Sequence, residues 1–325
     1  MNLKDIILKA CEEDTEAVDF FIKISDLYSD RGDLERALNI KEVILSLPLG
    51  KNKKEEILLG LSKDFHRAGM YDNALSVLDE LFVTTEEKDE IIELQSHIYI
   101  ELKEWAKVIE IQKRKKNKNP DCLLFALCNL SKDMLIEGDK KRAVLLLKEA
   151  ELISKDHPHI LFHWVDIYIT ENNMQEITAI GQKIRQSSPV FFGVYLEKIM
   201  VYKAFNKDIF ELTLKHIKEK RQDMFVIYQL ARYLFEAERY EDLVKLLESC
   251  VENINRAALL RLYIMALQRL DRSMNKRFYQ SFINLIPEET RWFRCKFCGY
   301  ESENYSFSCI RCNSINSFVL LERNE

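Results

Sequence analysis

Apolar residues recur through the first 290 residues at the three- and four-residue spacing of helices, with polar residues between them. Leu75, Leu78, Leu81 and Phe82 form one such stripe, and the strict alternation typical of half-buried strands is absent. Glycine and proline, which interrupt helices, number only 8 and 5 in 325 residues. The pattern therefore predicts an all-α fold for this part of the chain.

The helical pattern also repeats along the chain. The clearest unit, from Tyr28 to Leu38, recurs from Phe65 to Leu75 with an aromatic residue, a glycine and an alanine at matching places. A small or apolar residue fills the alanine position at regular steps, at residues 37, 74, 108, 143, 177 and 243. A degenerate copy over 205–212 fills the last gap, and a final copy covers 266–278. Such a period predicts stacked repeats rather than a generic helical bundle.

This period, close to 34 residues, resembles the tetratricopeptide repeat. Alanine suits the place where the second helix of a pair crosses the first closely, and Gly32, Gly69 and Gly138 suit the left-handed end of the first helix. One helix pair cannot bury its own apolar face, so the pairs stack. We expect a right-handed superhelical solenoid over residues 1–288, with about 7–8 repeats and an incomplete first one.

The chain ends in two Cys-x-x-Cys pairs, Cys295 with Cys298 and Cys309 with Cys312. Each pair can present two sulfurs to one ion, and the two together complete a tetrahedral shell of four thiolates. Gly299 follows the first pair and Asn313 the second, where a sharp turn favours residues that tolerate positive φ. Two disulfides, or four unrelated cysteines, are the alternatives. The pattern predicts one bound metal ion, with iron and zinc both suited to four sulfur ligands.

Residues 289–325 are too few to form an adequate core alone, so the metal would stabilise this segment as a small separate domain. We expect two hairpin-like turns around one ion, packed on the last repeats. A closed shell of four protein ligands leaves no position for a substrate, which argues against catalysis by the metal. The aromatic residues available for packing are Trp292, Phe293, Phe297, Tyr300, Phe307 and Phe318.

The net charge and the absence of targeting signals argue against further classes of function. The net charge is −5, which disfavours general nucleic-acid binding. No signal peptide and no apolar run of membrane-spanning length is present, and the other cysteines stand singly in helical patterns. The sequence therefore indicates a cytoplasmic protein, with Cys11, Cys122, Cys128 and Cys250 as buried apolar residues.

Motifs for catalysis are missing, including phosphate-binding glycine loops and zinc-protease patterns. His159 and His163 stand four apart on an expected helix, with His157 just before them, and can form a two-histidine metal face. Surface or capping roles for these histidines are the simpler interpretation. The basic run over 113–118 is most simply a solvated helix end. We expect a non-enzymatic protein that binds other proteins through its repeats.

The combination of repeats with a four-cysteine end resembles the lipopolysaccharide assembly protein B family, over nearly the whole chain. Three stretches carry this resemblance: 27–37, 64–74 and 293–300. It implies a rubredoxin-like metal domain held by Cys295, Cys298, Cys309 and Cys312. It also implies an adaptor at the cytoplasmic face of the inner membrane. That adaptor would promote turnover of the lipid A pathway deacetylase by a membrane-anchored AAA+ protease, and so regulate lipopolysaccharide synthesis.

Two departures from the family stand out. Family members usually begin with a transmembrane helix, whereas here the amphipathic segment around Leu3, Ile6 and Ile7 resembles the second helix of an incomplete repeat. Either an anchor that precedes Met1 is missing, or this is a soluble relative that reaches the membrane only through partners. In addition, Ile310 stands where the family usually has proline. Three other functions remain open: a generic soluble repeat adaptor, an iron–thiolate electron carrier and a nucleic-acid-binding zinc ribbon.

Overall fold

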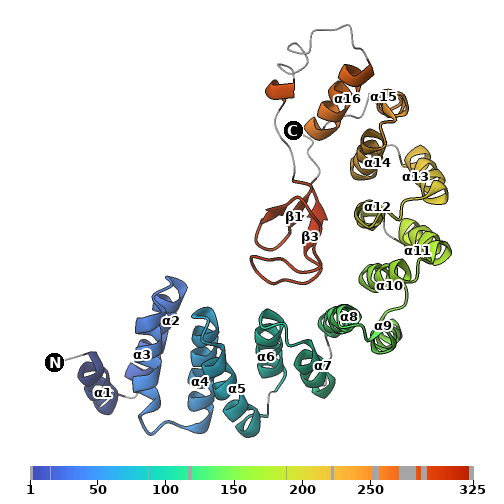
Figure 1. Ribbon diagram of the computed structural model, residues 1–325. Coiled ribbons are helices and arrows are strands. Elements are labelled where there is room, and N and C mark those ends of the chain that lie inside the picture. Colours follow the sequence, from blue (N-terminus) through green and yellow to red (C-terminus); the bar gives the residue numbers. More distant parts are fainter. Residues whose placement is uncertain are drawn as a thin grey trace. The chain divides into compact units, whose positions relative to one another are not determined.

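The computed structural model describes residues 3–14, 16–86, 88–115, 119–187, 189–220, 223–250, 256–270, 283–286 and 291–321. The chain divides into two compact units, Met1–Ala126 and Leu127–Glu325. Helix α8 (Pro120–Ile136) runs across the boundary between them. The described residues are mostly helical, as the sequence predicts, and the strands lie near the C-terminal end (Figure 1).

The first unit is built from helices that pack against the next helix and, in several cases, the next but one. Thus α4 contacts both α5 and α6, and α1 contacts both α2 and α3. Ile7 of α1 is fully buried, because it lies on the apolar side of this amphipathic helix. The helices are α1 Leu3–Glu13, α2 Glu16–Asp30, α3 Leu34–Leu45, α4 Lys51–Arg67, α5 Tyr71–Thr84, α6 Asp89–Glu101 and α7 Trp105–Arg114.

The second unit continues the same arrangement and adds a small sheet. Here α12 contacts α11 and α14, and α14 contacts α15 and α16. Its elements after α8 are α9 Lys140–Ile153, α10 Pro158–Thr170, α11 Met174–Ser187, α12 Pro189–Val201, α13 Lys207–Glu219, α14 Met224–Glu236, α15 Tyr240–Glu248, α16 Ala257–Leu270, β1 Phe293–Cys295, β2 Glu301–Ser302 and β3 Phe318–Leu320.

The small-residue position of the repeat lies where the second helix of each pair meets the first. All six residues at this position are completely buried, and each belongs to the first turns of its helix. A large polar side chain there would separate the helices, which explains why the position repeats in the sequence. The prediction of stacked helix pairs is confirmed at Ala37, Ala74, Val108, Ala143, Ile177 and Leu243.

The turns within the pairs also follow one geometry. Gly32, Gly69 and Gly138 have φ of 82°, 72° and 88°, so the predicted left-handed helix ends are confirmed. The residue after each glycine donates its backbone N–H to the carbonyl five residues back, as in the bond from Asp33 to Tyr28 of 2.9 Å. Four further turns place other residues in the same conformation: Lys103, Asn172, Lys203 and Glu238. The repeats that contain these four turns match the repeat pattern less well in sequence, because they lack the glycine.

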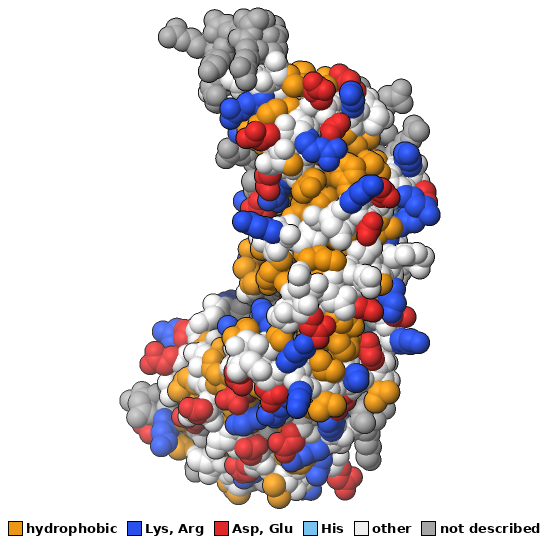
Figure 2. All heavy atoms as spheres, turned by 45° about the vertical axis from the view of Figure 1, so that its right-hand side comes forward, with side chains coloured by type: hydrophobic (Ala, Val, Ile, Leu, Met, Phe, Trp, Pro, Cys, Tyr) orange, Lys and Arg blue, Asp and Glu red, His pale blue; other side chains and the backbone are white. Residues whose placement is uncertain are grey.

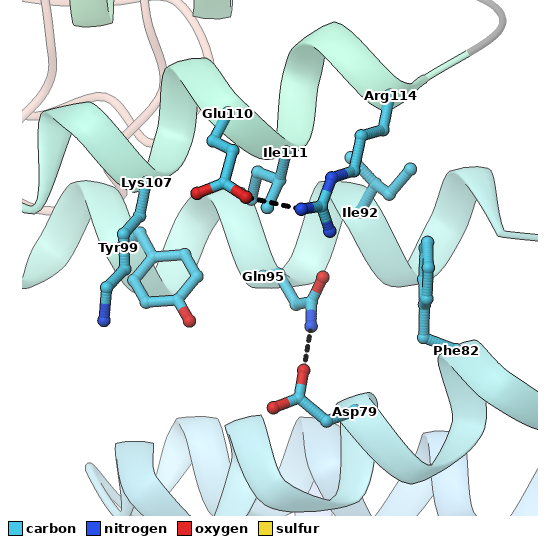
Figure 3. A pocket seen from close by; sticks show the side chains of 9 residues that line it. All are labelled: Asp79, Phe82, Ile92, Gln95, Tyr99, Lys107, Glu110, Ile111 and Arg114. Atoms are coloured by element: carbon cyan, nitrogen blue, oxygen red, sulfur yellow. Dashed lines mark hydrogen bonds and ion pairs between the residues drawn. The ribbon is translucent and has the colours of Figure 1, made fainter.

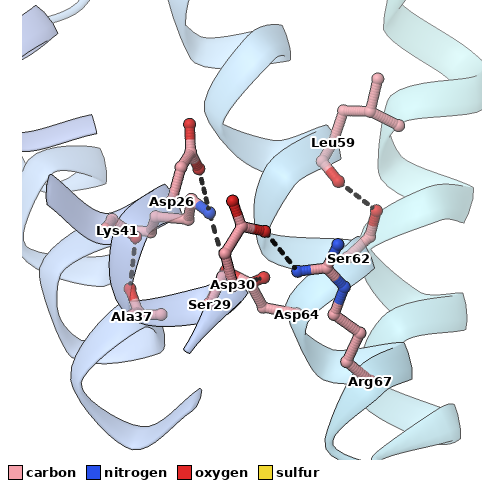
Figure 4. Close-up of polar contacts among 10 residues, drawn as sticks. Asp26, Ser29, Asp30, Ala37, Lys41, Leu59, Ser62, Asp64 and Arg67 are labelled. Carbon is pink, nitrogen blue, oxygen red and sulfur yellow. Dashed lines mark hydrogen bonds and ion pairs between the residues drawn. The ribbon is translucent and has the colours of Figure 1, made fainter. Parts of the chain in front are cut away.

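The core of the first unit contains a charged side chain among its apolar ones. Lys41 of α3 is 2% exposed, and its Nζ lies 2.7 Å from Asp64 of α4 and 2.9 Å from Asp26 of α2. Ser29 donates a hydrogen bond to the same Asp64 carboxylate (Figure 4). Gly60 leaves room for the lysine, since a Cβ there would lie 3.1 Å from Lys41 Cε. Three helices are therefore joined by one ion-pair network, in which Lys41 and Asp64 are buried and Asp26 is exposed.

The sheet lies in what we call the tail, residues 291–321 of the described part. Its strands are antiparallel in the order β2-β1-β3, with Phe293 opposite Ser302 and Leu320. Trp292, Phe293 and Phe318 are buried, as expected of packing residues, but Phe297 is 67% exposed. Packing by Phe297 was therefore a wrong expectation, because its side chain points out of the first cysteine turn. The predicted domain boundary at residues 288 and 289 lies outside the described residues.

In the described part of the chain, none of the helices combines the length and the apolar character needed to cross a membrane.

Candidate metal centre

The first cysteine pair lies in a tight turn at the end of β1. Cys295 is the last residue of this strand, and its carbonyl accepts a hydrogen bond of 2.9 Å from the Gly299 N–H. The Cys295 N–H in turn donates to the Tyr300 carbonyl at 2.8 Å. Gly299 has a φ of 71°, a conformation that side chains with a Cβ rarely adopt. This turn folds Cys298 back so that its sulfur lies on the same side as that of Cys295.

The second pair repeats this turn bond for bond. The Asn313 N–H donates to the Cys309 carbonyl at 2.8 Å, and the Cys309 N–H donates to the Ser314 carbonyl at 3.0 Å. Asn313 has a φ of 54°, in the left-handed region that asparagine tolerates best after glycine. Ile310, which follows Cys309 in this turn, is 72% exposed and leaves both bonds intact. Two matching turns thus face each other.

The four sulfurs meet between the two turns, all within 4.8 Å of one another. Cys295 Sγ lies 3.7 Å from Cys312 Sγ, and Cys298 Sγ lies 3.6 Å from Cys309 Sγ. Four sulfurs at about 2.3 Å from one tetrahedral zinc ion would be about 3.8 Å apart, so these separations fit such an ion. The four cysteines are free thiols rather than disulfides. The group can hold a metal ion, and its arrangement suits zinc and iron equally.

Neighbouring hydrogen-bonding groups favour the thiolate form, which a metal requires, at Cys295 and Cys312, whereas burial and hydrogen bonding with the other three cysteines raise the pKa of Cys298 to about 12. Burial alone would raise the pKa of Cys295, but hydrogen bonding with Ser317 and with the backbone N–H groups of Cys298 and Phe297 lowers it to about 6. Burial is likewise outweighed at Cys312, where Ser314 lowers the pKa of the thiol. Ser314 Oγ lies 3.1 Å from Cys312 Sγ. The cysteine pattern did not reveal these serines, although both follow the second pair closely in sequence.

The tail packs against the first helices of three repeats in the second unit, as the sequence predicts for the last repeats. The Trp292 ring lies 5.0 Å from Phe225 and 4.9 Å from Tyr228, both on α14. Phe191 of α12 lies 5.0 Å from Tyr305. Figure 1 shows the sheet beside α10, α12 and α14. Contacts between aromatic rings therefore join the candidate metal centre to the repeats.

An arginine closes the same contact from the segment before α16. The guanidinium of Arg256 lies 4.9 Å from the centre of the Trp292 ring and donates a hydrogen bond to the Leu321 carbonyl. Arg256 is 6% exposed, so this contact is shielded from water. The residues of the repeats that contact the tail, including Arg256, could not be identified from the sequence, because many repeat positions carry similar residues.

The three histidines occupy different environments. His157 caps α10, since its Nδ1 accepts the His159 N–H at 3.2 Å, so the capping role is confirmed. His159 and His163 are 3% and 8% exposed, so a surface position was wrong for both.

The single cysteines Cys122, Cys128 and Cys250 are buried, as predicted, while Cys11 is half-buried.

The basic run at the end of α7 is less solvated than expected. Lys115 is 7% exposed and pairs with Glu93 of α6, so its positive charge is neutralised within the first unit. Arg114 pairs with Glu110 one turn earlier on α7. Residues 116–118 of the run lie outside the described residues.

A small pocket of about 220 Å³ lies on the first unit, between α5, α6 and α7 (Figure 3). Its charged groups are already paired within the unit. Gln95 donates to Asp79 at 2.8 Å, and Lys107 lies 5.1 Å from the centre of the Tyr99 ring. The nine lining residues include no cysteine, serine or histidine.

Comparison with known proteins gives curated relatives of one kind. The lipopolysaccharide assembly protein B of Escherichia coli strain K12 is 26% identical over 185 residues, which cover 55% of this chain and 48% of that protein. The chain thus matches about half the length of this relative. The lipopolysaccharide assembly protein B of Haemophilus influenzae is 23% identical over 94% of this chain and 79% of its own length.

Solved structures similar to this chain include tetratricopeptide repeat proteins. One from Parabacteroides merdae has a TM-score of 0.41 and 13% identity, and covers 77% of this chain and 98% of that one. No protein-family model matches the chain. The resemblance predicted from the repeats and the cysteines is confirmed by the curated relatives: this chain is similar to lipopolysaccharide assembly protein B.

Proposed function

We propose that this chain is a non-catalytic adaptor in lipopolysaccharide assembly. The observation that carries the proposal is the packing of a four-cysteine tail on the first helices α10, α12 and α14 of a repeat array. Helical repeats present extended surfaces that bind other proteins. The curated relatives named lipopolysaccharide assembly protein B support the choice of process.

In this proposal, Cys295, Cys298, Cys309 and Cys312 hold one zinc or iron ion. The ion would supply a cross-link between the two cysteine turns, because a shell of four protein ligands leaves no open position for a substrate. Its role is then to keep the tail folded against α10, α12 and α14. The electron-carrier alternative requires a red iron protein with reversible one-electron chemistry. A colourless protein with one zinc ion in this tail would exclude that alternative.

The partners in this proposal are proteins. They are the membrane-anchored AAA+ protease and the lipid A pathway deacetylase that the family resemblance implies. The chain would act at the cytoplasmic face of the inner membrane, through these partners or through an anchor of its own. Figure 2 shows acidic, basic and hydrophobic side chains mixed over the face in view, which suits protein contacts better than a nucleic-acid backbone.

A direct test reconstitutes the protease in lipid vesicles with purified deacetylase. The half-life of the deacetylase is then measured with and without this chain. We expect the chain to shorten the half-life, and we expect the double variant Cys298→Ser/Cys309→Ser to do so less well. An unchanged half-life at every concentration of the chain would contradict the proposal. In that case, binding of unrelated proteins through the repeats would favour the generic adaptor instead.

A further inference from the structure

The second unit contains another group of metal-binding residue types, separate from the four tail cysteines. Cys128 of α8 and His159 and His163 of α10 each place one ligand atom within 4.8 Å of the other two. The histidines stand four residues apart, so they share one face of α10, and their ring centres lie 5.0 Å apart. Helix packing between repeats brings the cysteine to the same point.

We propose that Cys128, His159 and His163 form a second, buried site for a transition-metal ion of the zinc type. One thiolate and two imidazoles are a ligand set that zinc accepts, and the fourth position would be filled by water. The three side chains belong to residues that are 0%, 3% and 8% exposed. An ion at this place would be enclosed by the core of the second unit.

His163 has a carboxylate beside one of its ring nitrogens. Its Nδ1 lies 3.4 Å from Asp166 Oδ2, and Lys198 Nζ lies 2.7 Å from Oδ1 of the same carboxylate. Metal-bound histidines commonly direct one ring nitrogen to a carboxylate, which fixes the ring and leaves the other nitrogen for the ion. His163 Nδ1 makes no hydrogen bond at this distance, and we assign Nε2 to the metal because Nδ1 is the ring nitrogen beside Asp166. Asp166 also offsets the positive charge of Lys198 beside the site.

The histidines are also in the protonation state that a metal needs. Burial holds the pKa of His159 well below its ordinary value, and burial also lowers the pKa of His163. Both rings are therefore neutral near pH 7, so protons do not compete with an ion for them. Burial raises the pKa of Cys128, so binding of an ion would release the thiol proton to solvent.

The site lies directly beneath the tail. The Phe307 ring, from the segment between the two cysteine turns, stacks on His159 at a centre-to-centre distance of 3.8 Å and an angle of 17°. Phe307 also lies 5.7 Å from Phe162 of α10. An ion that fixes the His159 ring would therefore fix the platform on which the tail packs. This inference does not rest on the proposed function.

The test is the metal content of the purified full chain after saturation with zinc and removal of unbound ions. We expect Cys128→Ser and His163→Gln each to bind one zinc ion fewer per chain than the wild type. Cys122→Ser, a buried cysteine earlier on the same helix, should keep the wild-type count. The two variants come from different helices, so one remains informative if the other fails to fold.

The alternative is that the three residues are an ordinary polar part of the core. In that case a folded Cys128→Ser or His163→Gln variant, with the helical circular dichroism of Cys122→Ser, would bind as much zinc as the wild type. That result would overturn the second site, whatever the tail cysteines bind. A wild-type count of one ion, lost only when a tail cysteine is replaced, would overturn it as well.

Discussion

At the four tail cysteines, each sulfur is positioned by backbone hydrogen bonds as well as by its neighbours. The bonds from Gly299 to Cys295 and from Asn313 to Cys309 close two equivalent turns, at 2.9 and 2.8 Å. Loss of one sulfur would leave three ligands for a centre that we propose to be closed by four. The turns have little apolar material of their own, so a metal ion would contribute much of their stability.

Replacement of a tail cysteine should therefore remove the metal and unfold the tail only. We expect Cys298→Ser or Cys309→Ser to lose one metal ion per chain, measured by elemental analysis. The helical circular dichroism should change little, because repeat stability is local. Cys250→Ser, a buried cysteine far from the tail turns in sequence, is the control and should keep the ion. Loss of helical signal throughout the chain would contradict this separation.

Glu197 of α12 is a residue at which pH should affect stability. Burial raises the pKa of its carboxyl group, and the nearby carboxylate of Glu303 in the tail adds to this effect, while Arg232 opposes it. The folded pKa then exceeds the unfolded one, so the folded chain holds more protons between the two values. The stability contributed at low pH is lost as pH rises through the folded pKa.

The variant Glu197→Gln should escape that loss. We expect a higher thermal unfolding temperature than the wild type near pH 7, with the difference shrinking as the pH falls to about 4. Thermal unfolding followed by circular dichroism across this range measures the effect. Glu211→Gln, an exposed site on α13, is the control. A constant difference between Glu197→Gln and the wild type at every pH would show that the carboxylate charge is not the cause.

At the scale of helices, close approach between α12 and α14 depends on Gly193. A Cβ at this position would lie 2.4 Å from Phe225 Cδ1, closer than atoms can approach without displacement. Phe225 also contacts Trp292 and Phe293 of the tail. One small residue therefore serves both the packing of two repeats and the platform under the tail.

The variant Gly193→Ala should force Phe225 to move. We expect a loss of about 1–3 kcal/mol in the free energy of unfolding, measured by urea denaturation. The intrinsic preference of alanine for helices acts in the opposite direction, so a loss would identify the clash as its cause. Gly50→Ala has nothing within 4 Å of the added Cβ and serves as the control. Stabilisation of Gly193→Ala would contradict the close contact.

The ion-pair network of Lys41 joins α2, α3 and α4 in the first unit (Figure 4). The variant Lys41→Met would leave the carboxylate of Asp64 buried with only Ser29 as its side-chain partner among these residues. We expect a loss of about 3–5 kcal/mol in the free energy of unfolding. The double variant Lys41→Met/Asp64→Leu should recover much of it, because no unpaired charge remains buried and Asp26 is exposed. Equal losses in the single and double variants would contradict this explanation.

For the whole molecule, the sequence was most informative where one position recurs in every repeat. Ala37, Ala74 and Ala143 could be placed at helix crossings because the same packing requirement returns with each period. The turns of Lys103 and Glu238 were less evident, since other residues there adopt the conformation that glycine favours. Local sequence therefore predicts the repeat better than it predicts its irregular copies.

The candidate metal-binding residues likewise fall into a group whose meeting could be predicted from the sequence and a group whose meeting could not. The four tail cysteines are close in sequence, so their meeting follows from two local turns and could be predicted. The meeting of Cys128 with His159 and His163 depends on how two repeats stack, which no local pattern expresses. The contacts of Phe225 and His159 with the tail also depend on how the repeats stack, so they could not be predicted either. Long-range packing is thus the part that sequence alone did not supply.

The central claim is that the tail is a metal-held unit packed on repeats that are stable without it. Hydrogen exchange of the full chain, before and after metal removal by a chelator, tests this most directly. The account predicts loss of protection at the amides of the two turns, including Gly299 and Asn313, while helices α2 to α7 and α9 to α15 stay protected. Unchanged protection at these turns, or its loss through the helices of both units, would contradict the account.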